Sequence, residues 1–278
     1  MSERKGYQHG VPCWVAGVFP DPQQAVDFYT ELFGWEATNL MPAEHPGDYF
    51  LCTLRGRNVA AIVSEDGAPP PPRPVWGTHI WVESADQAAA KVTDAGGSIL
   101  GDPFDSPGGG RMAVLADPSG AVFCAWEPRG RRGAQVVNEP GAWSMSLLNT
   151  RDPEGSSEFY GALFGWEPEA MEPGDGGINM MRLPGFDGGE PEQPVPRDVV
   201  AVMAPMSGDQ FPDEMPSHWS VDFWVNDADA TAEKAAEQGG AVIAPPYDVP
   251  GVGLRQAALA DPQGAAFSVT RAPGPPTS

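Results

Sequence analysis

The sequence is poor in positive charge and has no long apolar run, and each shortage excludes a class of protein. The chain has 16 Lys and Arg residues, only three of them Lys, and 38 Asp and Glu residues, which gives it a formal net charge of −22. Binding to nucleic acid or to an anionic membrane depends on basic residues, so neither is expected. No apolar run approaches the roughly 20 residues of a spanning helix. The start, MSERKGYQHG, lacks the apolar region of a signal peptide, which predicts a cytoplasmic protein.

Cysteines and familiar catalytic motifs are also scarce. Cys13, Cys52 and Cys124 are an odd number with no CxxC spacing, which predicts reduced thiols rather than disulfides or a zinc site. GxSxG, Walker-type and HExxH motifs are absent from the sequence. Apolar residues make up 41% of the 278 residues, enough for a packed core in two domains of ordinary size. The acidic excess favours solubility, and the alternative is attraction of a cationic ligand.

Two long segments of the sequence occur twice. DPQQAVDFYTELFGWE (21–36) aligns with DPEGSSEFYGALFGWE (152–167), 131 residues later. RMAVLADPSGAVF (111–123) aligns with RQAALADPQGAAF (255–267), 144 residues later. These pairs indicate a tandem duplication, with the 13-residue difference expected as additional sequence between 171 and 197. The predicted domains are 1–130 and 138–272, joined by a linker at 131–137.

Each half divides again into two similar modules of strand, helix and several strands. In the first module, Asp21 is expected to cap a helix that Pro22 begins. Gly34 is expected to end that helix in a left-handed conformation, and Trp35 to fold back on its last turn. Strands outnumber helices, which predicts an α+β protein with mixed sheets. The modules are expected at about 11–66, 75–128, 140–206 and 217–271, with APPPPRP (68–74) as a stiff linker between the first two.

Taken together, the motifs resemble those of the vicinal oxygen chelate superfamily, which includes glyoxalase I, bleomycin-resistance proteins and extradiol dioxygenases. The resemblance rests on FYxxLFGWE, on helices ending in AGG or QGG, and on LADPxGAxF, and it covers 11–128 and 140–271. It implies four βαβββ modules paired into two domains, each with a sheet curled around a cleft. Such a fold does not by itself decide the reaction.

Metal-using members of that superfamily place His, Glu or Gln ligands on the first strand of a module and the last strand of a domain. Alignment on the helices and on DPxG assigns those positions to Trp14, Gly77, Cys124, Met145, Ser220 and Ser268. None is His, Glu or Gln, so neither a metal nor another cofactor is expected. A shift of two residues would place His79 and Asp222 at ligand positions, each still without most of its partners.

Alternation along the strands predicts which side chains face the clefts. The set is Trp14, Ala16, Val18, Gly77, His79, Trp81, Cys124 and Trp126 in the first half, and Trp143, Met145, Leu147, His218, Ser220, Asp222, Trp224, Ser268 and Thr270 in the second. Five of the nine tryptophans fall in it. This fits either packing between curled sheets or an aromatic-walled pocket for a planar molecule.

Two titratable groups on this face, His79 and Asp222, are the candidate catalytic residues. An imidazole at His79 could exchange protons near neutral pH, and the alternative is a hydrogen-bonded structural histidine. Asp222, at the matching position, could be an acid, a base or a cation anchor. Arg111 and Arg255 also match each other, and they predict scaffold salt bridges or, alternatively, an anion site.

The sequence therefore predicts a metal-independent protein that binds a small aromatic or hydrophobic molecule in a Trp-lined cleft. Acid–base catalysis of isomerase, cyclase or lyase type in specialised metabolism would use His79 or Asp222. One alternative is drug sequestration of the bleomycin-resistance type, for a cationic aromatic drug, and another is a metal-dependent lyase or dioxygenase. We expect a monomer or homodimer whose partner is the small molecule, with no nucleic acid or membrane. The predicted ligand contacts are Trp14, Trp81, Cys124, Trp126, Trp143, Met145, His218, Ser220 and Trp224.

Overall fold

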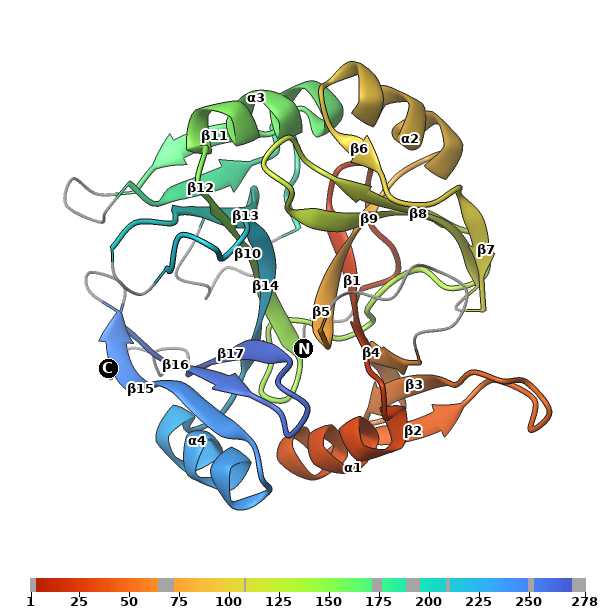
Figure 1. The fold of residues 1–278 in the computed structure, drawn as a ribbon, viewed down its shortest axis with the longest axis vertical. Helices are drawn as coiled ribbons and strands as arrows, with labels where there is room; N and C mark the ends of the chain where they lie inside the picture. Colours follow the sequence, from red (N-terminus) through yellow and green to blue (C-terminus); the bar gives the residue numbers. More distant parts are fainter. Residues whose placement is uncertain are drawn as a thin grey trace.

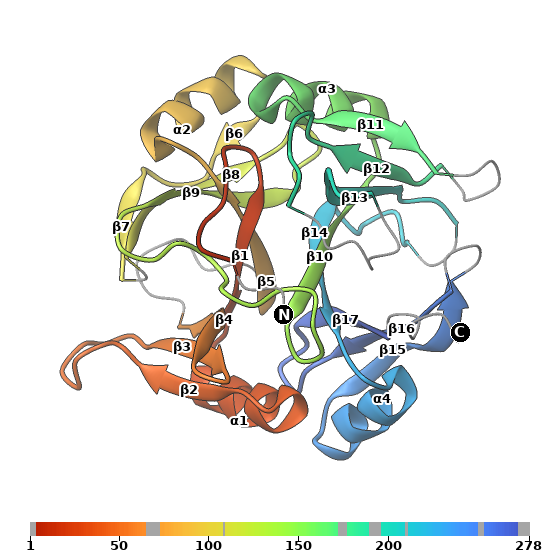
Figure 2. The same cartoon turned by 180° about the vertical axis from the view of Figure 1, so that it is seen from behind.

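Two curled sheets lie side by side with helices on the outside of the molecule (Figures 1 and 2). The computed structural model describes residues 4–64, 73–107, 109–171, 177–188, 196–208, 211–249 and 253–271. Most of the predicted linker 68–74 and parts of the additional sequence between 171 and 197 lie outside these residues. No helix in the described chain is long and apolar enough to cross a membrane.

The first half of the chain forms a sheet with the strand order β2-β3-β4-β1-β5-β9-β8-β6, and β7 pairs with β8. Its elements are β1 (Pro12–Val18), α1 (Pro22–Phe33), β2 (Glu36–Asn39), β3 (Tyr49–Leu54), β4 (Arg57–Val63), β5 (Val75–Trp81), α2 (Ala85–Asp94), β6 (Ser98–Ile99), β7 (Phe104–Ser106), β8 (Gly110–Ala116) and β9 (Val122–Pro128).

The second half repeats this order as β11-β12-β13-β10-β14-β17-β16-β15. Its elements are β10 (Trp143–Thr150), α3 (Pro153–Phe164), β11 (Glu167–Ala170), β12 (Asn179–Arg182), β13 (Val199–Pro205), β14 (His218–Trp224), α4 (Ala228–Glu237), β15 (Ala241–Val249), β16 (Leu254–Ala260) and β17 (Ala266–Arg271). In both sheets the first strands of two modules pair antiparallel at the centre, β1 with β5 and β10 with β14. The duplication and the α+β fold of paired modules are thus confirmed.

The local signals at the helix ends are also confirmed. The Asp21 carboxylate accepts a hydrogen bond from the Gln24 amide at 3.0 Å, and Pro22 begins α1. Gly34 ends the helix at φ 73°, a left-handed conformation that glycine adopts without steric cost. Trp35 then folds back, its ring centroid 5.0 Å from that of Phe33.

The two halves share their apolar cores in a crossed arrangement. Helix α1 lies beside α4, and α2 lies beside α3 (Figure 1). Each core joins aromatic rings from both halves of the chain, one around α1 and the other around α3. The first contains Tyr29, Phe33, Trp35, Trp76, Phe223 and Phe267, and the second contains Phe123, Phe159, Tyr160, Phe164, Trp166 and Trp219. Both halves therefore contribute side chains to each core.

The repeated Trp of LFGWE connects the two halves directly. The Trp35 indole donates a hydrogen bond to the Gly141 carbonyl at 2.6 Å, and the Trp166 indole donates to the Gly10 carbonyl at 2.7 Å. The LADPxG motif joins the same interface, because the Tyr160 hydroxyl donates to Asp117 at 3.2 Å. The repeated motifs therefore stabilise the contact between the halves.

Arg111 and Arg255 form the scaffold salt bridges that the sequence predicts. Arg111 pairs with Asp86, in the first turn of α2, at 2.7 Å and with Asp105 at 3.2 Å. Arg255 makes the matching pairs with Asp229 and Asp248. These pairs tie β8 and β16 to the helix that covers each sheet.

Candidate functional site

The strand register on the concave faces differs from the sequence alignment by two residues. Trp14 pairs with His79 across β1 and β5, and His79 pairs with Cys124 across β5 and β9. Gly77 pairs with Ala16 instead, further along the strand. The second sheet has the matching row Met145, Asp222 and Ser268. His79 and Asp222 therefore replace Gly77 and Ser220 at the level where relatives would hold a metal.

Neither row has the donors of a metal site. Trp14 offers no ligand atom, so its row holds only two donors, His79 and Cys124. Asp222 already accepts hydrogen bonds at both oxygens, one from Ser144 and one from Thr270, at 2.6 Å each. Among the described residues, no cluster of three or more His, Cys, Asp or Glu could hold a metal ion. The side chains on these two concave faces therefore do not fit a metal of the kind that superfamily members bind.

Asp222 is the centre of a buried polar network on the second concave face. Gln256 donates to its carboxylate at 3.3 Å, and the Tyr247 hydroxyl donates to Gln256 at 2.6 Å. Asp222 is 3% exposed, and burial raises its pKa from 3.8 to about 6, against the opposing effect of the bonds from Ser144, Thr270 and Gln256. A carboxyl group of this kind can take up and release a proton near neutral pH.

His79, at the matching level of the first face, has a different environment. The ring is 5% exposed and lies edge-on to Trp126, with 6.0 Å between centroids. Burial lowers the pKa of His79 to about 4, so the imidazole is neutral at physiological pH. The lowered pKa disfavours proton exchange by His79 near neutral pH, and a catalytic role for His79 stays a prediction. Asp222 is the better candidate for that role.

A β-bulge corrects the predicted position of Trp143. The register shifts between Trp143 and Met145, so Trp143 pairs with Phe223 of the shared aromatic core. Ser144 takes its place on the concave face and donates to the Asp222 carboxylate. One extra residue reverses the direction of every side chain before it, because side chains alternate along a strand.

The first concave face is closed in this structure, although the sequence predicts a Trp-lined cleft there. Trp14 and Trp126 are each 2% exposed. The Arg131 guanidinium lies 5.7 Å from the Trp14 ring centroid and donates a hydrogen bond to the Tyr49 hydroxyl at 2.8 Å. Arg131 thus stacks over the aromatic floor as a cation–π cover. Cys124, on the same face, has its thiol pKa raised to about 12 by burial, so it is not a ready nucleophile.

The linker that carries Arg131 fits closely against β1. A Cβ on Gly133 would lie 2.5 Å from the Cys13 carbonyl oxygen, and its φ is 82°. The Ala134 amide donates to that same carbonyl at 2.8 Å. Only glycine allows this approach. The segment predicted as a linker is therefore part of the wall of the first domain.

The other predicted contacts lie on the second concave face. Asn149 donates to Ser220 at 3.1 Å, and the His218 ring is held by the Pro216 carbonyl at 2.9 Å. Met145 and Trp224 are half-buried there. This face is polar, whereas the first face is aromatic. The duplicated halves have thus diverged in chemistry while keeping one topology.

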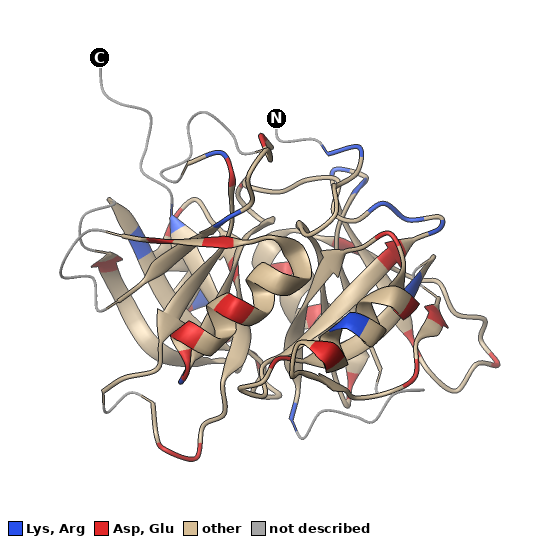
Figure 3. Cartoon of the chain, turned by 90° about the horizontal axis from the view of Figure 1, so that it is seen from above, with Lys and Arg blue, Asp and Glu red and all other residues tan. Residues whose placement is uncertain are grey.

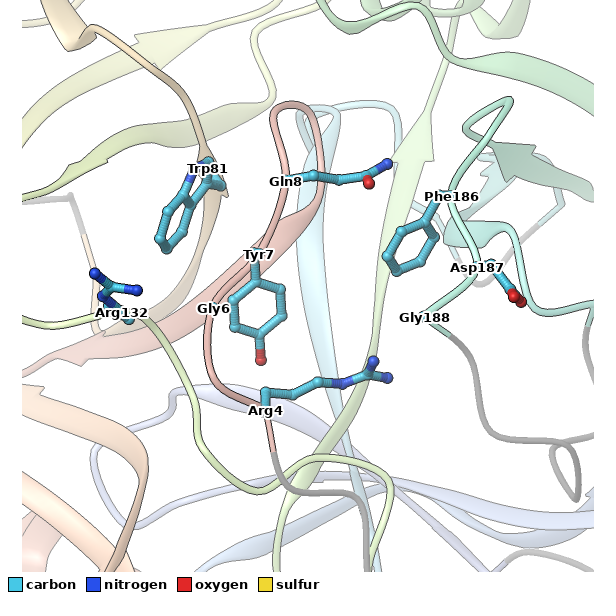
Figure 4. A pocket seen from close by; sticks show the side chains of 9 residues that line it. All are labelled: Arg4, Gly6, Tyr7, Gln8, Trp81, Arg132, Phe186, Asp187 and Gly188. Carbon is cyan, nitrogen blue, oxygen red and sulfur yellow. The ribbon is translucent and has the colours of Figure 1, made fainter.

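An open pocket lies between the two halves, beside the closed face. It has a volume of about 340 Å³, and Figure 4 shows its side chains. Tyr7 and Trp81 form one aromatic wall, 6.2 Å apart between centroids, and Phe186 of the second half stands opposite. Its lining residues are Arg4, Gly6, Tyr7, Gln8, Trp81, Arg132, Phe186, Asp187 and Gly188.

Sequence reasoning found only Trp81 among these residues. The segment from Arg4 to Gln8 belongs to no predicted element, and Phe186 lies in the region of additional sequence. The sequence does contain one sign of this pocket: two basic segments, ERKGY (3–7) and RGRR (129–132), in an otherwise acidic chain. These two segments lie close together because the linker holds the N-terminal segment, through the hydrogen bond that the Arg4 amide donates to the Gln135 carbonyl at 2.8 Å.

Comparison with known families agrees with this architecture. Residues 14–125 match the model of the glyoxalase/bleomycin resistance protein/dioxygenase superfamily, and residues 145–270 match that of a glyoxalase-like domain. The chain belongs to this superfamily, also called the vicinal oxygen chelate superfamily, and consists of two glyoxalase-like domains. Members of the superfamily bind small-molecule substrates.

Two relatives are similar over almost the whole chain. The protein named "Putative glyoxylase CFP32" of Mycobacterium tuberculosis is 39% identical, covering 98% of both chains. The anthracycline biosynthesis protein DnrV of Streptomyces peucetius is 34% identical, covering 94% of this chain and 92% of its own.

Solved structures show the same fold at low identity. The Mn(II)-bound glyoxalase of Novosphingobium aromaticivorans aligns at a TM-score of 0.62 and 15% identity, covering 95% of this chain and 82% of its own. The 2,2',3-trihydroxybiphenyl 1,2-dioxygenase of Sphingomonas wittichii aligns at 0.61 and 12% identity, covering 95% and 91%. At such identity the likeness concerns the fold.

Proposed function

We propose that this protein binds a small aromatic molecule, without a metal, in the pocket between its two domains. The observation that carries the proposal is the aromatic wall of Tyr7, Trp81 and Phe186 around a volume of about 340 Å³. Ligand pockets commonly lie at domain interfaces and combine aromatic walls with a few polar groups. The similarity to an anthracycline biosynthesis protein supports an aromatic ligand and a role in specialised metabolism.

The charges at this pocket disfavour a cationic drug as its ligand. Arg4 and Arg132 both line it, and the one acidic lining residue among those described, Asp187, pairs with Arg197 at 2.9 Å. A cation would therefore meet two guanidinium groups, despite the acidic composition of the whole chain. Sequestration of a neutral or anionic molecule remains compatible with this arrangement.

The binding proposal can be tested with 2-naphthol, a neutral bicyclic phenol, by isothermal titration calorimetry. Trp81→Leu is expected to weaken binding at least tenfold, because the indole supplies one wall of the pocket. Trp224→Leu is the matched control: Trp224 occupies the position of Trp81 in the duplicated strand and is not among the residues that line the pocket. Equal affinities of the two variants would contradict the proposal.

Metal independence has a direct measurement. Purified protein is expected to bind ligand equally before and after dialysis against a chelator, because the concave rows lack a donor set. Elemental analysis would contradict this if it found one tightly bound ion in each domain.

The three described cysteines are free, which accords with our placing the protein in the reducing cytoplasm.

A second candidate function is proton transfer by Asp222, and its pKa of about 6 favours it. An isomerase, cyclase or lyase step would need a group that is ionised in a fraction of molecules at neutral pH. The rate of such a step is expected to change with pH near 6 and to lose that dependence in Asp222→Asn. Turnover that keeps the same pH profile in the variant would remove Asp222 from this role.

A further inference from the structure

A second cavity, next to the aromatic pocket, is lined by an unusual concentration of positive charge. Its volume is about 410 Å³. The lining residues are Arg4, Lys5, Arg57, Asn58, Gly130, Arg131, Arg132, Gly133 and Gln135. Five of the sixteen Lys and Arg residues of a chain with net charge −22 are thus collected at one place, with no Asp or Glu among the described lining residues. In Figure 3 several blue segments lie close to the N-terminus, while other blue segments and the red segments are spread over the molecule.

Backbone contacts bring these cations together from three distant parts of the sequence. The Arg4 amide donates to the Gln135 carbonyl at 2.8 Å, and the Gln135 amide donates to the Asn58 carbonyl at 2.7 Å. Arg131 is fixed by the Tyr49 hydroxyl and by its stack on Trp14. Like charges repel, so the fold holds them together at an energetic cost. Such a cost is typical of a binding site rather than of a scaffold.

One polar group at this place is buried and unsatisfied. The Arg4 Nε is shielded from solvent and has no hydrogen-bond partner among the described residues. A buried donor without a partner destabilises the protein by about 1–3 kcal/mol. An acceptor on a bound anion would relieve that cost.

The basic cavity and the aromatic pocket adjoin each other. Arg4 and Arg132 line both of them. In Figure 4 these two side chains lie on either side of the Tyr7 ring, with Trp81 beside Arg132 and Phe186 beside Arg4. One ligand can therefore place a ring between the aromatic side chains and a charged group among the cations.

We infer that the protein recognises an aromatic phosphate ester, with the phosphate in the basic cavity and the ring in the adjoining pocket. Guanidinium groups bind phosphate oxygens through paired, charge-assisted hydrogen bonds, and lysine adds a point charge. The position of the ring rests on the function proposed above. The anion site does not, since its residues Lys5, Arg57 and Arg131 lie outside the aromatic pocket.

Three probes separate the two parts of the inferred site: inorganic phosphate, 2-naphthol and 2-naphthyl phosphate. Each is titrated calorimetrically into the full-length protein at one fixed ionic strength, because salt screens these charges. The phosphate ester is expected to bind at least tenfold more tightly than either of the other probes. An ester that binds no better than 2-naphthol would overturn the inference.

Charge variants test the anion site itself. Lys5→Gln and Arg132→Gln are each expected to weaken inorganic phosphate and 2-naphthyl phosphate about fivefold or more. Lys91→Gln, which removes an exposed charge on α2, serves as the matched control and should leave both affinities unchanged. Lys5→Gln should also leave 2-naphthol binding unchanged. Equal phosphate affinities in the Lys5 and Lys91 variants would overturn the anion site.

The two proposals fail in different ways. If 2-naphthol binds at Trp81 but phosphate binding is absent or independent of Lys5, the aromatic pocket stands and the anion site is wrong. If phosphate binding depends on Lys5 and Arg132 but 2-naphthol does not bind, the anion site stands and the aromatic pocket is wrong.

Discussion

Trp35→Ala is expected to lower the free energy of unfolding by about 3–5 kcal/mol, the usual effect of removing a buried Trp side chain. Trp35 is 4% exposed, and its ring lies 5.6 Å from that of Phe223, in the other half of the chain. Its indole also donates the hydrogen bond to Gly141. The variant therefore loses apolar burial and an interdomain bond together. Urea unfolding followed by circular dichroism measures the change.

A smaller substitution at Trp35 separates the effect of the hydrogen bond to Gly141 from the effect of burying the aromatic ring. Trp35→Phe keeps an aromatic ring but leaves the Gly141 carbonyl without its donor, which is expected to destabilise by about 1–3 kcal/mol. Trp166→Phe should behave alike, because Trp166 makes the matching bond to Gly10 at 2.7 Å. Trp224→Phe, on a half-buried concave position outside the shared cores, is the control and should change stability least. A Trp35→Phe protein as stable as this control would contradict the interdomain role.

Asp222→Asn is expected to raise the stability of the protein at pH 7 to 8 by up to about 3 kcal/mol, the value of a pKa moved from 3.8 to about 6. In the folded protein the carboxyl holds its proton at a higher pH than in the unfolded chain. The folded state therefore binds more protons between about pH 4 and 6, and stability falls as pH rises through that range. Asparagine cannot ionise, and its amide can still bond Ser144, Thr270 and Gln256.

The measurement is the free energy of unfolding of both proteins at several pH values from 4 to 8. The difference between them should be small at pH 4 and should reach its maximum above pH 6. Ser268→Ala, on the same row of the face but without a titratable group, should keep the slope of the parent protein. A slope between pH 4 and 6 that survives in Asp222→Asn would show that another group is responsible. A gain in stability would also indicate that this carboxylate is retained for function at the expense of stability.

The elements and their duplication could be read from the sequence because they depend on neighbours in the chain. The cap at Asp21, the stop at Gly34 and the pairing of Arg111 with Asp86 all involve residues within 25 positions of each other. Because the same motifs occur in both halves, the elements of the second half could be predicted from those of the first. The superfamily followed from these motifs and from their spacing.

The concave faces were harder to predict, since small errors in register change them completely. The bulge at Ser144 moves Trp143 to the opposite side of the sheet, and no residue in the segment is of a type that predicts a bulge. The alignment of β5 from its following helix was two residues wrong, so His79 and not Gly77 stands level with Trp14. Strand pairing decides this level, and pairing is a long-range property.

The sequence by itself determined that this protein is a duplicated α+β chain with acidic character. Only the tertiary structure decided where the aromatic pocket and the basic cavity lie. Arg4, Trp81, Arg132 and Phe186 come from four separate segments. They meet because the N-terminal segment, β5, the linker and a loop of the second half pack against one another. Local patterns report how each segment folds. A pocket between segments depends on how they pack, which no single segment encodes.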